Sequence, residues 1–239
     1  MNVYELGKYY FDLGEFEKAK KIIEGCIKKW EVSDIQTLDL VLSCCVELGQ
    51  RDEYIRISKS YALLSGLPEP DFKYLERYLN LIEDGLVLIH GKNKKGKQFL
   101  GTGFSLKKDK IITAETLIRD AEPEDIQIIG RLRTICVKEI IIDPSGNIAI
   151  LLPDDILKYQ LHLGEFSFTL PGEIVAVPGF TKRLPLNFKN CISITKTKIK
   201  SIDRVTSSRI PQIILEKKMN AGYNGSPVIN ELGFVIGII

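Results

Sequence analysis

Residues 221–230 read AGYNGSPVIN, and the rest of the chain is interpreted outward from this stretch. Its first seven positions are rich in glycine, asparagine, serine and proline, the residues that favour tight turns over regular structure. Val228 and Ile229 then open an apolar run, which is typical of a strand. The stretch therefore predicts a loop that leads directly into a strand.

The sequence around this loop has the period of β-structure. From Gly85 onward, short apolar runs with a period of two are separated by turn residues. A basic hairpin turn is expected at residues 91–97. Strands are expected at residues 86–89, 99–106, 110–114, 172–180, 191–201, 210–216 and 232–239.

Three further motifs precede the loop. Residues 101–104 read GTGF, residues 113–118 read TAETLI, and residues 140–151 read IIIDPSGNIAIL. With the loop, and in this order, they resemble motifs of trypsin-like serine proteases of the bacterial HtrA-like type. The resemblance covers about residues 85–239 and implies two β-barrels, at approximately 85–165 and 166–239. That family normally adds a strand after the last one here, so the resemblance implies either an unusual closure or a fragment.

The same alignment places other residues where the family has its catalytic triad. Thr116 stands at the position of the general-base histidine, Asn147 at that of the orienting aspartate, and Asn224 at that of the nucleophilic serine. An amide is not a useful nucleophile, and a threonine hydroxyl does not accept a proton near neutral pH. Only the backbone of Gly222 and Asn224, with Tyr223 between them, could retain an oxyanion hole. The resemblance therefore implies a pseudoprotease.

A non-standard peptidase site is the first alternative. The chain has two histidines, His90 and His162, and neither falls in a family motif. Ser226 lies two residues beyond the nucleophile position and is expected to face away from the cleft. Cys136 and Cys191 lie in strand-like stretches, so a cysteine–histidine pair would need an unrelated site.

The first third of the chain has the period of helices instead. Apolar residues recur at helical spacing in two segments between residues 4 and 30, with a break at residues 13–14. Leu6-Gly7, Tyr10, Gly14, Phe16 and Ala19 resemble the signature of one tetratricopeptide repeat. Further helices are expected at residues 39–48, 52–64 and 71–83. Because such folds generally need about three repeats, a docking or capping role is favoured over independent peptide capture.

Composition and charge set the broad class. No apolar run approaches the ~20 residues of a membrane span, and residues 1–12 have no signal-peptide pattern, so a cytoplasmic protein is expected. The five cysteines lack metal-ligand spacing, so neither a metal nor a cofactor is expected. Residues 1–84 carry 11 basic and 16 acidic side chains, the remainder 22 and 15. This asymmetry favours two modules with different surfaces.

Basic residues gather in the second half of the β-rich region. Lys196, Lys198 and Lys200 alternate, so they would share one face of a strand. A solvated strand edge is one interpretation, and an acidic protein partner is the functional one; nucleic acid is disfavoured because no such motif is present. Further members of this cluster are Lys182, Arg183, Lys189, Arg204 and Arg209.

The sequence therefore predicts an α+β protein of two domains. A tetratricopeptide-like helical domain at residues 1–66 and a linker helix at 67–84 precede a trypsin-like double β-barrel at 85–239. The expected function is a non-enzymatic, protein-binding regulatory scaffold, with Tyr10 and Phe16 as a second binding surface. A nucleic-acid-binding module remains an alternative. The architecture resembles bacterial stress and antiviral signalling systems, including protease-linked CRISPR modules, by analogy only.

Overall fold

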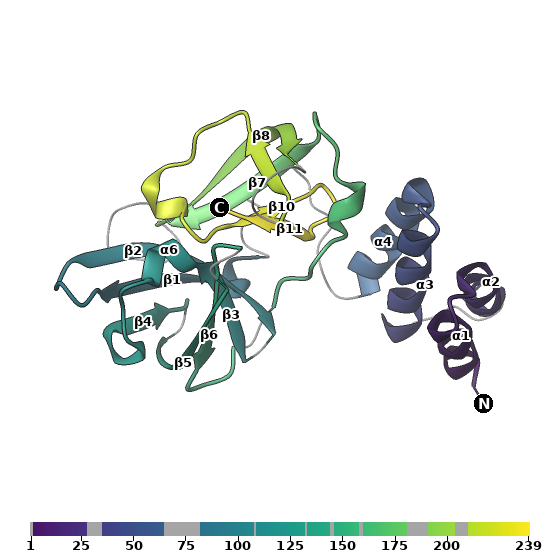
Figure 1. Ribbon diagram of the computed structural model, residues 1–239, viewed down its shortest axis with the longest axis horizontal. Helices are drawn as coiled ribbons and strands as arrows, with labels where there is room; N and C mark the ends of the chain where they lie inside the picture. Colours follow the sequence, from purple (N-terminus) through teal and green to yellow (C-terminus); the bar gives the residue numbers. More distant parts are fainter. Residues whose placement is uncertain are drawn as a thin grey trace. The chain divides into compact units, whose positions relative to one another are not determined.

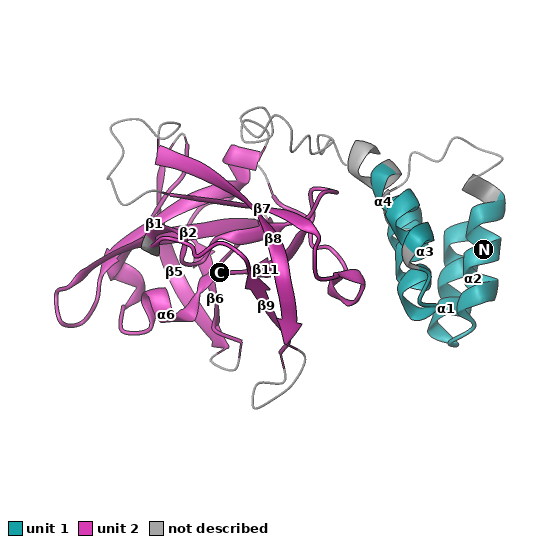
Figure 2. Ribbon diagram, turned by 90° about the horizontal axis from the view of Figure 1, so that it is seen from above, with its two compact units in different colours: residues 1–70 teal, residues 71–239 magenta. Residues whose placement is uncertain are grey.

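The chain forms two compact units, residues 1–70 and 71–239 (Figure 2). The structure, a computed structural model, describes residues 2–27, 35–64, 82–107, 109–131, 133–143, 146–157, 160–180, 191–203 and 210–239. In this part of the chain, no helix is long and apolar enough to cross a membrane. The predicted boundaries at residues 66 and 84 stay predictions.

The first unit consists of helical hairpins. Its helices are α1 (Val3–Asp12), α2 (Phe16–Ile27), α3 (Ile35–Glu47) and α4 (Arg51–Leu64). Asn2 starts α1 with a capping box, and Gly14 (φ 77°) and Gly49 (φ 65°) adopt the left-handed conformation in the turns after α1 and α3. Gly7 lets α1 approach α2, because a Cβ there would lie 2.6 Å from Ile23 Cγ1.

The helix bounds differ from the sequence prediction in two places. The third helix begins at Ile35, four residues before the predicted start at Asp39. Ile82, in the predicted helix 71–83, is helical, and Glu83 begins a short 3-10 helix, η1 (Glu83–Gly85). Helix ends are the least predictable part of a periodic pattern. The rest of the predicted helix, residues 71–81, lies outside the described residues.

The second unit begins with a closed six-stranded barrel. The strand order is β1-β2-β3-β6-β5-β4, and each neighbouring pair is antiparallel. A short helix, α6 (Glu115–Ile118), follows β3, and η2 (Pro123–Asp125) precedes β4. The strands are β1 (Leu86–Lys92), β2 (Gln98–Lys107), β3 (Lys110–Ala114), β4 (Ile126–Ile129), β5 (Thr134–Asp143) and β6 (Ile148–Pro153).

A second, five-stranded sheet follows in the same unit, in the order β11-β10-β7-β8-β9 (Figure 1). The 3-10 helices η3 (Phe166–Phe168) and η5 (Ala221–Tyr223) precede β7 and β10. The strands are β7 (Ile174–Phe180), β8 (Ile192–Asp203), β9 (Gln212–Leu215), β10 (Pro227–Ile229) and β11 (Val235–Ile238). The predicted fold class is confirmed: helices, a six-stranded barrel and a half-barrel, consistent with a trypsin-like double β-barrel.

Apolar clusters of the described residues organise the second unit. One fills the first barrel around Val87, Ile111 and Leu151. Another lies inside the second sheet around Val175 and Ile199. The third joins residues of both halves, including Leu88 and Phe104 of the first barrel and Phe180 and Ile229 of the second sheet. The loop at residues 221–226 is built on this junction.

Candidate active site

The loop at residues 221–226 is held in one shape by its own backbone. The Tyr223 N–H donates to Asn220 O (3.0 Å), the Ser226 N–H to Tyr223 O (2.8 Å), and the Gly225 N–H to Ile239 O (2.8 Å). Gly225 has φ +85°, and a Cβ there would lie 2.1 Å from Thr102 O. Both the backbone conformation and the lack of space therefore require glycine.

Thr102 of β2 ties this loop to both halves of the unit. Its buried hydroxyl donates to Gly222 O (2.9 Å) and accepts from the Phe180 N–H (3.0 Å). Its backbone N–H donates to Asn224 O (2.9 Å). Its carbonyl accepts from Thr113 Oγ1 (2.8 Å). Sequence reasoning used Thr102 as a motif position and gave it no role in the site.

Tyr223 anchors the loop on the second sheet. Its ring is buried, and its hydroxyl lies 3.1 Å from Thr195 Oγ1, which donates to it, and 3.4 Å from Ser193 O. A Cβ at Gly179 would lie 2.6 Å from the ring, so glycine makes room for it. Tyr223 therefore holds the loop on the second sheet through both its ring and its hydroxyl.

Thr116 and Asn147 lie in direct contact. Thr116 is exposed in the first turn of α6, and its backbone N–H donates to Asn147 Oδ1 (2.9 Å). The Glu115 N–H donates to the Asn147 carbonyl (3.0 Å). Asn147 adopts a left-handed conformation, with φ 52°. The structure therefore brings together two positions that are 31 residues apart.

Asn224 lies against the strand that also contacts α6. A Cβ at Gly101 would lie 2.8 Å from Asn224 O and 2.4 Å from Leu117 Cδ2. Leu117 directly follows Thr116 in α6. Gly101 therefore lies next to both Asn224 and Leu117, the residue that follows Thr116.

The acidic residue nearest to Thr116 in the chain is paired with a cation. Glu115 is 4% exposed, and both its oxygens accept from the Arg119 guanidinium at 2.6 Å. The hydrogen bonds from Arg119 lower the pKa of Glu115 below its ordinary value. This carboxylate is therefore a weak base and is committed to its partner. The i,i+4 spacing on a helix was the sequence signal for this pair.

The other candidate groups are dispersed. His90 lies on β1, opposite Leu100 and Gln127, and the His162 carbonyl accepts from the Val235 N–H. Ser226 is fully buried, and its hydroxyl lies 2.6 Å from the Cβ position of Gly179. Cys136 is exposed on β5, and Cys191 is buried just before β8.

The predicted lysines lie on β8. Thr197 and Ile199 between them are buried, and Lys198 and Lys200 are exposed. Lys200 is the extra residue of a β-bulge, because Ile199 pairs with Leu215 and Ser201 with Ile214. The other basic residues of the predicted cluster, Lys182, Arg183, Lys189, Arg204 and Arg209, lie outside the described residues.

The first unit contains the predicted aromatic surface. The Lys18 ammonium lies 3.9 Å from the ring centroid of Tyr10, and the Phe16 ring packs edge-on against Phe11 at 5.1 Å. Both pairs join α1 to α2, which gives these aromatic residues a structural role.

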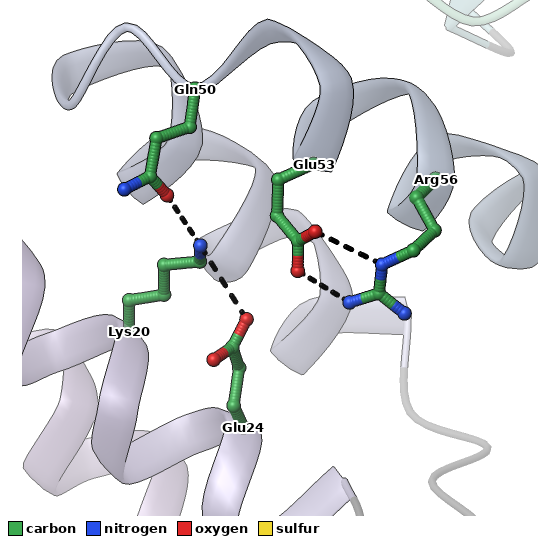
Figure 3. Close-up of polar contacts among 5 residues, drawn as sticks. All are labelled: Lys20, Glu24, Gln50, Glu53 and Arg56. Atoms are coloured by element: carbon green, nitrogen blue, oxygen red, sulfur yellow. Dashed lines mark hydrogen bonds and ion pairs between the residues drawn. The ribbon is translucent and has the colours of Figure 1, made fainter.

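A polar cluster that sequence reasoning missed joins α2 to α4 (Figure 3). Lys20 donates to Gln50 and lies 3.6 Å from Glu24, and Glu53 binds Arg56 through both oxygens. Lys20, Gln50 and Glu53 also line a pocket of about 550 Å³. The bond from Lys20 to Gln50, the residue before α4, therefore links the first helical hairpin to the second. Among the described residues, no group of three or more His, Cys, Asp or Glu side chains could hold a metal ion.

The chain was compared with known protein families, sequences and structures. No protein-family model matches the chain. A probable periplasmic serine endoprotease DegP-like protein from Ectopseudomonas mendocina is 25% identical over 176 residues, 73% of this chain. One from Pseudomonas fluorescens is 27% identical over 188 residues, 77% of this chain. The chain spans 35% and 37% of these relatives' lengths, little more than a third.

Solved structures give the same result for the fold. The Rv3671c protease from M. tuberculosis in its active form has a TM-score of 0.57 at 20% identity, covering 72% of this chain and 76% of that one. Its inactive form scores 0.55 at 19% identity, covering 72% of this chain and 85% of that one. The HtrA-type protease AlgW with tripeptide scores 0.56 at 17% identity, covering 67% and 52%. Active and inactive forms match about equally, so the likeness concerns the fold and not the catalytic state.

Proposed function

We propose that this chain, whose second unit has the fold of trypsin-like serine proteases, is a non-catalytic protein-binding and regulatory module. The observation that carries the proposal is the Thr116–Asn147 contact. The amide oxygen of Asn147 accepts the backbone N–H of Thr116, so the two positions that the resemblance assigns to the base and its orienting carboxylate are neighbours and are joined by a structural hydrogen bond. Neither group titrates near neutral pH.

The chemistry of peptide hydrolysis is missing at each step. The reaction needs a nucleophile, a base that removes its proton, and a charge that stabilises the protonated base. At the corresponding positions this chain has Asn224, Thr116 and Asn147. The neighbouring Glu115 is held by Arg119 and cannot substitute. In a serine protease, removal of the triad lowers kcat by roughly 10⁶.

The loop is a fixed part of the second unit and can serve as part of a binding surface. Thr102, Tyr223 and Gly225 fix the loop between the two halves of the unit, so it is a rigid structural element. The helical hairpins of the first unit resemble a tetratricopeptide-like docking domain, and we assign them that role. A place in bacterial stress or antiviral signalling follows only from analogy of architecture.

The test is hydrolysis of casein and peptide esters by the wild-type protein and two variants. The wild type and the double variant Thr116→His, Asn147→Asp are expected at background. The triple variant, which adds Asn224→Ser, is expected to show measurable turnover, because it restores all three groups at the aligned positions. Wild-type turnover above that of the double variant would contradict the proposal and indicate a non-standard site.

A further inference from the structure

We draw no further inference here: the strongest candidate, the exposed apolar patch of Ile141 and Ile142 on the β5–β6 hairpin, carries nothing because no contact of the described residues shows what covers it.

Discussion

Replacing Thr102 with valine tests how the loop is held. The two side chains have nearly the same shape, so Thr102→Val removes the hydroxyl and little else. Gly222 O then loses its donor at 2.9 Å, and the Phe180 N–H loses its acceptor at 3.0 Å, both in a fully buried setting. Leaving a buried polar group unsatisfied costs about 1–3 kcal/mol. With two groups affected, we expect a loss of about 2–6 kcal/mol in the free energy of unfolding.

Urea unfolding gives the total loss, and hydrogen exchange locates it. A loss of about 3 kcal/mol corresponds to a roughly 100-fold lower protection factor. We expect this fall in the amides of the loop and of β7. Thr134→Val, the same replacement at an exposed position of β5, is the control and should stay within about 0.5 kcal/mol. If Thr102→Val were equally harmless, Thr102 would not be the tie between the two halves.

Three other outcomes follow from the same structure. Gly225→Ala should lower the free energy of unfolding in urea by about 2–5 kcal/mol, because the residue has a positive φ and a Cβ there would overlap with backbone atoms. The control Gly172→Ala has a φ of +89° but open space around it, so it should cost only about 1–2 kcal/mol. Equal costs would contradict a steric conflict at Gly225. Because Arg119 lowers the pKa of Glu115, the ionised carboxylate stabilises the fold at pH values above its ordinary pKa of 4.5. This stabilisation is lost as the pH falls below that value and the carboxylate becomes protonated. Glu115→Gln should therefore flatten the pH dependence of the unfolding free energy below about pH 4.5, and an unchanged profile would contradict the pairing. Gel shifts with duplex DNA should be absent at physiological salt; binding whose log K falls by roughly 0.9 per phosphate contact per log unit of salt would restore the nucleic-acid alternative.

The helices and strands that carry a clear hydrophobic period and turn residues at their ends were predicted from the sequence. The helix break at residues 13–14, with the left-handed Gly14, and the strand at residues 110–114 were readable from period and turn residues. β4 and the first half of β5 were missed. In β5, exposed residues such as Lys138 alternate with the buried Ile135 and Val137, and no motif marked this weak alternation as a strand.

Contacts between distant residues were not readable from local patterns. Thr102 and Gly222 are 120 residues apart, and their bond depends on how β2 passes the loop. The resemblance paired Thr116 with Asn147 as positions, but not the backbone-to-side-chain bond between them. The alternation of Lys196, Lys198 and Lys200 predicted that they share one face of a strand. The bulge at Lys200 was not predicted, because it arises from the pairing of β8 with β9. These contacts depend on how strands and loops pack in three dimensions, and that packing cannot be inferred from one sequence.

Intact-mass measurement after incubation with a fluorophosphonate probe shows whether the protein has a reactive serine. We expect no adduct on the wild-type protein, because our proposal places Asn224 at the nucleophile position and the hydroxyl of Ser226 is buried against Gly179. The triple variant Thr116→His, Asn147→Asp, Asn224→Ser serves as the positive comparison and is expected to gain one adduct. Stoichiometric labelling of any serine in the wild-type protein would contradict the account and show that the trypsin-like unit is an active hydrolase.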